Sequence, residues 1–147
     1  MPSFMDLALE QASKARDNGE VPVGCVIVRD GSAIAAAGNR TLTDRDPTAH
    51  AEIVAIRAAA KALGSERLTE CDLYVTLEPC AMCAGAIVLA RVERLVIGAM
   101  DPKAGFAGSL GDLVRDGRLN HRVAVETGVL AEECGDVLRA FFRDRRA

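Results

Sequence analysis

The sequence predicts an α/β protein with three layers, α/β/α, around a central mixed sheet of about five strands. Short apolar runs that suit strands alternate with helical stripes along most of the chain. The first two runs, 21–28 and 33–37, are joined by Asp30-Gly31, which is a strong hairpin signal. An antiparallel hairpin followed by alternating strands and helices predicts a mixed sheet with helices on both faces.

Periodicity and capping residues define the individual elements. Ser3 and Asp6 form a capping-box pattern, and Pro22 favours the start of a strand over its middle. The second helix follows Asp46-Pro47-Thr48 and is expected to bury a combination of Ile53, Ile56, Ala60 and Leu63. We expect the helices at 3–18, 48–64, 80–90 and 131–146. The remaining strands are expected at 73–77, 95–97 and 123–125.

Length and composition limit the class of protein. The 147 residues fit one domain, expected to span 1–147, and 27% charged residues is ordinary for a soluble globular chain. No apolar run can span a bilayer, and the first ten residues carry two acidic side chains, unlike a signal peptide. Five cysteines, an odd number, suit reduced thiols, with Cys25, Cys71 and Cys134 as small core residues. We therefore expect a cytoplasmic protein that does not bind membranes.

The segment that carries the chemistry is Thr76–Cys83, read together with His50-Ala51-Glu52. Pro79 suits the first position of a helix, and Cys80 and Cys83 then lie three residues apart on its first turn. The positive end of a helix dipole favours the thiolate form that zinc requires. One histidine and two thiolates make three protein ligands, and catalytic zinc sites keep the fourth position open for water.

A lone Cys-x-x-Cys pair fits a redox site or two buried core cysteines equally well. His-x-Glu followed by Pro-Cys-x-x-Cys is instead the signature of zinc-dependent nucleobase deaminases. In this interpretation His50, Cys80 and Cys83 bind zinc, and Glu52 moves the protons of the water that zinc activates. As an alternative, Glu52 is an ordinary carboxylate in the first turn of a helix.

Several further blocks occur in a fixed order around this signature. They are 19–24, 46–52, 73–86, 105–109, 120–123 and 141–143. Together they closely resemble the bacterial tRNA-specific adenosine deaminases, from the first helix to the last. The resemblance implies a cytidine deaminase-like fold and hydrolysis of the wobble adenosine of a tRNA anticodon to inosine. It also implies a homodimer with one Zn²⁺ per subunit and the tRNA anticodon arm as the partner.

The resemblance also indicates residues that contact the substrate. It assigns Asn39 to the substrate, although an asparagine after a hairpin is otherwise typical of a turn. Val23 and Asn120 lie in the matching blocks and are expected at the substrate as well. Asp101 in a glycine-rich loop either caps a turn or accepts a hydrogen bond from a ribose 2′-OH. His121 either contacts the substrate or packs against the protein.

The last helix carries Arg143, Arg145 and Arg146 near its end. Such a run of charge is usually a solvated face, but here it can lie along tRNA phosphates. Phe141 and Phe142 are expected to anchor this helix, or one of them lines the RNA groove. The net charge of −3 means that RNA recognition has to come from a local patch or a shaped pocket.

Two other functions remain open at this stage. The same metal site serves deaminases of a free base or nucleoside such as guanine, cytosine or cytidine, which turn over a small molecule without RNA. A zinc-stabilised binding module without catalysis is the third possibility. It needs a fourth protein ligand, for which His121 and Cys25 are the candidates.

Overall fold

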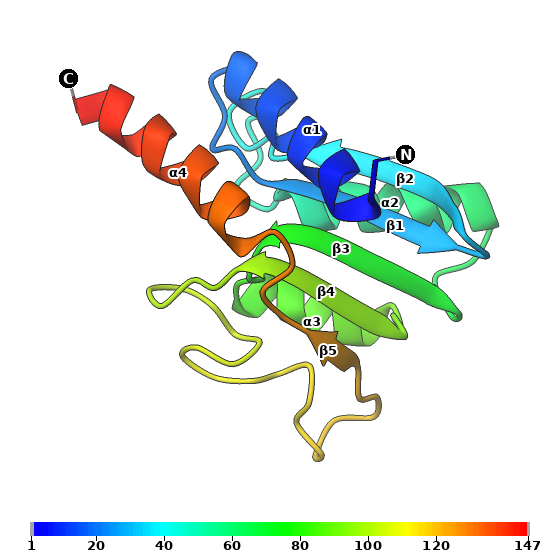
Figure 1. Cartoon of the computed structure of the whole chain (residues 1–147). Coiled ribbons are helices and arrows are strands. Elements are labelled where there is room, and N and C mark those ends of the chain that lie inside the picture. Colours follow the sequence, from blue (N-terminus) through cyan, green and yellow to red (C-terminus); the bar gives the residue numbers. More distant parts are fainter. Residues whose placement is uncertain (1, 147) are drawn as a thin grey trace.

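The computed structural model describes the backbone of residues 2–146 and the side chains of residues 2–145 (Figure 1). Within this range, four helices surround one five-stranded sheet. The helices are α1 (Phe4–Asp17), α2 (Ala51–Leu63), α3 (Ala81–Leu89) and α4 (Ala131–Arg146). The strands are β1 (Gly24–Arg29), β2 (Ser32–Gly38), β3 (Cys71–Leu77), β4 (Arg94–Ala99) and β5 (Ala124–Glu126).

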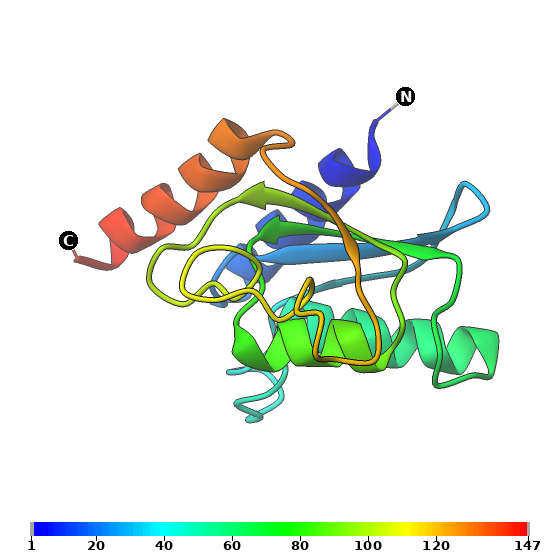
Figure 2. The same cartoon turned by 90° about the horizontal axis from the view of Figure 1, so that it is seen from below.

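The sheet is mixed, and its strand order is β2-β1-β3-β4-β5. β1 pairs antiparallel with both β2 and β3, whereas β3, β4 and β5 are parallel. α1 and α4 cover one face, and α2 and α3 cover the other, as Figure 2 shows from below. The predicted three-layer fold with a mixed five-stranded sheet is confirmed.

The hairpin between β1 and β2 turns at Asp30 and Gly31, which have positive φ angles of 51° and 76°. This geometry matches the turn that Asp-Gly favours. The first strand begins at Gly24, three residues later than predicted, because the ladder with β2 starts at the pair Gly24–Gly38. An added Cβ at Gly24 would lie 1.8 Å from the carbonyl oxygen of Ala8, so this glycine lets α1 lie directly on the strand.

The buried stripe of α2 differs from the prediction. Its fully buried apolar side chains are Ala51, Ala55 and Ala59, while the larger residues of the predicted stripe are only partly buried. Alanines at i, i+4 and i+8 let the helix approach the sheet closely. Ile56, Ala60 and Leu63 of the predicted set do pack against the core, but the more deeply buried alanines were not predicted.

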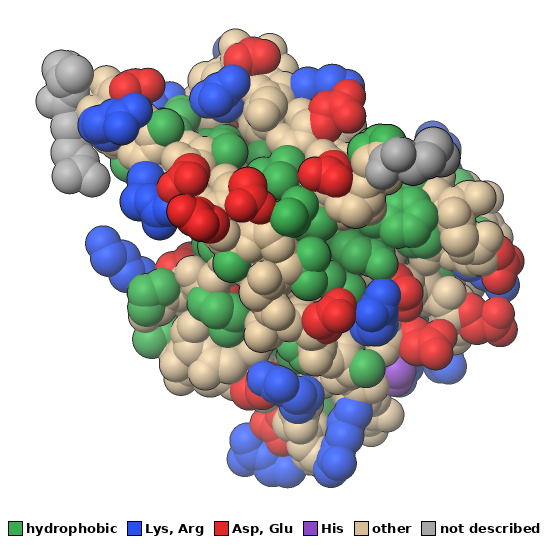
Figure 3. Space-filling model, viewed as in Figure 1, with side chains coloured by type: hydrophobic (Ala, Val, Ile, Leu, Met, Phe, Trp, Pro, Cys, Tyr) green, Lys and Arg blue, Asp and Glu red, His purple; other side chains and the backbone are tan. Residues whose placement is uncertain are grey.

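On the opposite face, α1 and α4 pack over the middle of the sheet around Met5, Val26, Val96 and Cys134. Figure 3 shows hydrophobic side chains that stay visible between these two helices. Cys25, Cys71 and Cys134 are all buried, as predicted. Among the described residues, no helix has the length and apolar character needed to cross a membrane.

Candidate active site

Two helices begin at the same edge of the sheet, beyond the carboxyl end of β3. His50 is the N-cap of α2 and Cys80 is the N-cap of α3, and both have extended backbone angles. Pro79 was predicted to be the first helical residue. It lies instead two positions before Ala81, where α3 begins. Its carbonyl oxygen accepts a hydrogen bond from the N–H of Phe106, which fixes the chain in an extended path before the helix starts.

The two helix starts bring one histidine and two cysteines together. Nδ1 of His50 lies 3.6 Å from Sγ of Cys80 and 3.5 Å from Sγ of Cys83. Tetrahedral zinc with a Zn–S distance of about 2.3 Å and a Zn–N distance of about 2.0 Å requires ligand separations of roughly 3.5 Å. Both distances from the histidine therefore match those of a zinc site, and all three ligand atoms lie within 4.8 Å of one another. Among the described residues, these three form the only cluster of this kind.

The two sulfur atoms are electronically different when no metal is present. A hydrogen bond from the Cys83 thiol, assisted by His50, lowers the pKa of Cys80 to about 3. The same interaction raises the pKa of Cys83 well above its ordinary value, with burial adding to the effect. These interactions favour the thiolate form of Cys80 over that of Cys83. That form suits metal binding.

Glu52 lies in the first turn of α2, only 4% exposed, and its side chain lines the cavity in front of the two helix starts. Burial raises the pKa of Glu52 to about 7. A carboxyl group whose pKa lies near neutrality exchanges a proton in either direction at little cost. Glu52 therefore has the property that general acid–base catalysis requires.

The cavity has a volume of about 260 Å³. This is slightly below the roughly 300–1,000 Å³ of pockets for drug-sized ligands, so it suits a single base. Besides His50, Glu52 and Cys80, three predicted substrate residues line it: Val23, Asn39 and Asp101. The structure therefore brings three of the five expected substrate residues to the metal ligands.

Asn39 and Asp101 are held differently at the cavity. Asn39 is 8% exposed, and its Nδ2 donates to Oε1 of Glu20 at 3.4 Å. Asp101 accepts hydrogen bonds through Oδ1 from the N–H groups of Lys103 and Ala104, at 3.1 and 3.3 Å. Asp101 thus caps a turn, and both of these bonds end on one oxygen.

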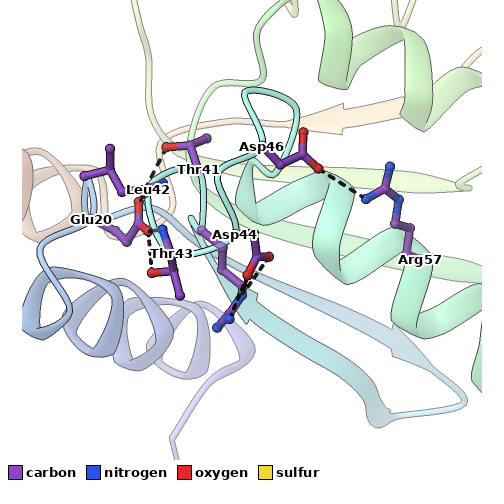
Figure 4. A network of polar contacts seen from close by, with 8 residues as sticks. Glu20, Thr41, Leu42, Thr43, Asp44, Asp46 and Arg57 are labelled. Carbon is purple, nitrogen blue, oxygen red and sulfur yellow. Dashed lines mark hydrogen bonds and ion pairs between the residues drawn. The ribbon is translucent and has the colours of Figure 1, made fainter.

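Two buried glutamates that sequence reasoning missed hold the walls of the cavity. Glu20 is 1% exposed and accepts hydrogen bonds from Thr41, Leu42 and Thr43 (Figure 4). Glu78 is 2% exposed and accepts hydrogen bonds from the loop after β4. Each glutamate stands next to an apolar segment in the sequence, a signal that could have indicated a buried carboxylate.

The structure does not bring Asn120 and His121 to this cavity. Nε2 of His121 lies 2.7 Å from the carbonyl oxygen of Val92, and its side chain lines a separate hollow with Arg67 and Arg91. That hollow lies beside Glu70 and Glu93, next to the starts of β3 and β4. It is therefore at the opposite end of the sheet from the metal ligands.

The arginines of α4 lie closer to the cavity. Arg145 donates to the carbonyl oxygen of Gly19 at 2.7 Å and lies 4.5 Å from the ring centre of Phe141. Arg143 is exposed and 3.7 Å from Asp144. The side chain of Arg146 lies outside the described residues. Phe141 is buried and Phe142 is 43% exposed, so only the first anchors the helix firmly.

A histidine and two cysteines with an adjacent glutamate form a three-ligand catalytic site, in which a metal activates water for hydrolysis. Residues 2–99 match the family described as the cytidine and deoxycytidylate deaminase zinc-binding region. The chain belongs to this family of zinc-binding deaminases.

Its relatives include proteins of nearly the same length. The chain is 52% identical over 143 residues to a tRNA-specific adenosine deaminase of Bacillus subtilis, a match that covers 97% of this chain and 89% of the relative. The corresponding protein of Haemophilus influenzae is 51% identical, with coverage of 97% and 83%.

Solved structures show the same fold. A structure from a study of A-to-I editing by tRNA deaminases at the wobble position superposes with a TM-score of 0.89 at 50% identity, covering 92% of this chain and 98% of that one. A guanine deaminase from Nitrosomonas europaea superposes with a TM-score of 0.82 at 26% identity, covering 93% and 81%.

Proposed function

We propose that the protein hydrolyses adenosine to inosine at the wobble position of a tRNA anticodon. The metal-ligand cluster and Glu52 account for the deamination chemistry. The choice of substrate rests on one observation, the identity of about half of all residues to tRNA-specific adenosine deaminases over nearly the full chain. The reaction consumes one water and releases one ammonia for each adenosine converted.

One Zn²⁺ per subunit, held by His50, Cys80 and Cys83, would supply the Lewis acidity that makes water a nucleophile at neutral pH. Glu52 accepts the proton of that water and passes it to the purine ring nitrogen as the C–O bond forms at C6. Glu52 then takes the proton of the new C6 hydroxyl group and delivers it to the departing amine, so that the C–N bond breaks with release of ammonia and C6 becomes a carbonyl carbon. Because Glu52 is buried beside the ligands, it can serve both steps without moving away.

The rest of the cavity holds the base. Asn39 offers an amide that can donate and accept, and Val23 offers an apolar contact to the purine face. A base that is stacked in RNA cannot reach this cavity, so it must turn out of the strand, which costs a few kcal/mol and least in a loop. An anticodon loop provides such a base.

A groove beside the cavity supports RNA as the substrate. Its volume is about 600 Å³, and it shares Val21, Leu77, Asp101 and Ala104 with the cavity. Lys103, Leu138, Phe142 and Arg145 complete its walls. Sites that bind single-stranded nucleic acid combine cationic side chains, which contact the phosphates, with exposed aromatic rings, on which bases stack. We propose that Arg143 and Arg146 of α4 contact the RNA backbone beyond this groove. Asn120 and His121 remain candidates for a more distant contact with the RNA.

Asp101 is proposed to distinguish RNA from DNA. It lines both the cavity and the groove, where a carboxylate oxygen can accept a hydrogen bond from a ribose 2′-OH. Replacing Asp101→Asn should raise activity on a DNA stem-loop relative to the RNA stem-loop by about thirtyfold, the value of one hydrogen bond to a charged group. An unchanged DNA-to-RNA ratio would contradict this role.

A homodimer and a cytoplasmic location complete the proposal. α3 is composed almost entirely of small and apolar residues, and Leu89 at its end is 77% exposed. Covering that surface with a second copy would remove an exposed hydrophobic side chain from water. The whole chain, 1–147, then acts as a single zinc-dependent deaminase domain. Sedimentation at micromolar concentration tests the dimer.

The decisive experiment measures inosine formation on an anticodon stem-loop with a wobble adenosine. Free adenosine, cytidine and guanine are tested in parallel, and Glu52→Ala serves as the inactive control. Inosine in the stem-loop without turnover of the small molecules is the expected result. Turnover of a free base alone would overturn the substrate and retain the zinc chemistry.

A second candidate is deamination of free guanine. It is favoured by the superposition on the Nitrosomonas europaea guanine deaminase and on a Bacillus subtilis guanine deaminase, the latter with a TM-score of 0.65 at 36% identity. These identities are clearly lower than the 50–52% shared with the tRNA enzymes. A non-catalytic zinc module lacks support, because the ligand cluster in the described residues contains no fourth protein ligand.

A further inference from the structure

The carboxylate of Glu78 is bonded to a single loop. Oε1 accepts a hydrogen bond from the N–H of Asp101 at 2.9 Å and another from the hydroxyl of Ser109. Oε2 accepts from the N–H groups of Ala107 and Ser109, at 3.0 and 2.9 Å. Hydrogen bonds to a charged acceptor are the stronger kind, and this side chain is almost fully buried. Glu78 therefore fixes the loop 101–109 at both of its ends.

The same loop is attached to the segment that carries the metal ligand Cys80. The N–H of Phe106 donates to the carbonyl oxygen of Pro79 at 2.8 Å, and Gly105 forms a β-bridge with Cys80. An added Cβ at Gly105 would lie 2.2 Å from Cδ of Glu78, and its three nearest atoms all belong to that carboxyl group. A glycine is thus required at 105 by the presence of Glu78.

The loop also forms the wall of the cavity. Asp101 and Ala104 line both the cavity and the adjoining groove, and Lys103 lines the groove. The N–H that Glu78 accepts at Oε1 belongs to Asp101 itself. The position of this wall relative to the metal ligands is therefore set by Glu78.

From this geometry we infer that Glu78 is a positioning residue for substrate binding, which holds the Asp101–Ala104 wall at a fixed distance from Cys80 and Glu52. Nothing in its contacts moves a proton or binds the metal. Its loss leaves the metal ligands and Glu52 in place but lets the wall occupy many conformations. Substrate affinity then falls more than the rate of the chemical step. The choice of RNA as the ligand of this wall rests on the proposed function.

The test uses the zinc-loaded full-length protein with Glu78→Gln, and Glu126→Gln as a matched control on the exposed strand β5. Amide hydrogen exchange in 101–109 should accelerate about thirtyfold, as expected for the loss of one hydrogen bond to a charged group, with α3 unchanged. On the wobble-adenosine stem-loop, KM should rise about tenfold while kcat changes less than about threefold. Ser109→Ala removes only the hydrogen bond from the hydroxyl group, so it should change loop exchange and KM in the same direction but by less. This variant keeps the inference testable if Glu78→Gln does not fold.

Unchanged loop exchange in both variants would overturn the inference, and so would a fall in kcat at constant KM. Loss of zinc without faster loop exchange would also overturn it, since Glu78 would then support Cys80 instead. The exchange measurement needs no substrate. A wild-type protein inactive on the stem-loop would therefore refute the proposed function while leaving the positioning role to be decided by exchange.

A double-mutant cycle tests the contact directly. Gly105→Ala should raise KM about tenfold in the wild-type background, because the new methyl group displaces the carboxylate. In the Glu78→Ala background, where the carboxylate is absent, the same substitution should raise KM less than about twofold. Equal effects in both backgrounds would contradict the inference.

Discussion

The side chains of Glu52 and Glu20 are both almost fully shielded from solvent, yet the pKa values of the two carboxyl groups move in opposite directions. Burial raises the pKa of Glu52 to about 7. Burial also acts to raise the pKa of Glu20, but hydrogen bonds from Thr43, Leu42 and Thr41 outweigh it and hold the pKa below 4.5. The donors around Glu20 thus keep its carboxylate charged although its side chain is almost fully buried.

This difference separates a reactive group from a structural one. Glu20 is charged and saturated with donors, so it fixes the loop after β2 and holds Asn39 at the cavity. Glu52 faces the cavity at the start of α2, where a substrate and water complete its surroundings. Glu78 resembles Glu20, because burial is again outweighed by donors, led by Ser109, and its pKa is lowered. Two charged and hydrogen-bonded carboxylates, Glu20 and Glu78, thus act as anchors that hold the walls of the site. Glu52 at its centre can instead gain or lose a proton.

The largest expected effect is that of Glu52→Gln. The amide cannot shuttle a proton, so kcat should fall by about 10²–10⁴-fold. The free energy of unfolding should stay the same or increase, because a buried charge without adequate compensation is removed. Single-turnover kinetics and thermal denaturation, at equal zinc content, measure the two quantities. A variant with lower stability but nearly normal kcat would show that Glu52 has a structural role instead of a catalytic one.

Glu20→Gln should show the reverse pattern. The amide keeps one oxygen acceptor but presents its NH2 group either to the donors on Oε1, which include the N–H of Leu42, or to the two donors of Thr43 on Oε2, so the free energy of unfolding should fall by about 2 kcal/mol. The rate of the chemical step should change less than about threefold, since Glu20 does not face the reacting atoms. Urea denaturation and kcat measure the two effects. A loss of kcat without a loss of stability would remove the distinction drawn between the two glutamates.

The pH dependence of stability provides a second measure of Glu20. Its pKa is lowered from 4.5 in the folded protein, so below this pH the unfolded chain binds a proton that the folded protein does not. The stability that Glu20 contributes is therefore present above pH 4.5 and is lost as the pH falls through the folded-state pKa. The difference in unfolding free energy between wild type and Glu20→Gln should narrow over that range. A difference independent of pH would show that the folded-state pKa is not lowered.

The metal ligands and Glu52 could be identified from the sequence because each lies in a short motif at a helix start. His50 and Cys80 are separated by 30 residues, but the alternation of strands and helices predicts that both helix starts meet at one edge of the sheet. The hairpin was predictable for a similar reason, since two adjacent residues determine the turn.

The anchors could not be predicted in this way. Glu20 reaches Thr43 across 23 residues and Glu78 reaches Ser109 across 31, and neither pairing belongs to a short motif. Three of the four donors to Glu78 are backbone N–H groups, which carry no sequence signal. The deeply buried alanines of α2 were not predicted because alanines and isoleucines both look apolar, and only the closeness of the sheet selects the alanines for the deepest positions. Long-range contacts between loops thus determine the walls of the site, which the short motifs do not predict.

The smallest expected effect further tests the contrast between Glu20, which anchors a loop, and Glu52, which moves protons. Thr43→Val removes the hydroxyl that lies 2.6 Å from Oε2 of Glu20 but retains the backbone N–H bond to the same oxygen. The free energy of unfolding should fall by about 1 kcal/mol, and kcat should stay within about twofold of wild type. Thr127→Val, at an exposed position before α4, is the matched control and should change stability by less than about 0.5 kcal/mol. If Thr43→Val and Thr127→Val were equally mild, the remaining donors, which are Asn39, Thr41 and the backbone N–H groups of Leu42 and Thr43, would keep Glu20 charged without the Thr43 hydroxyl.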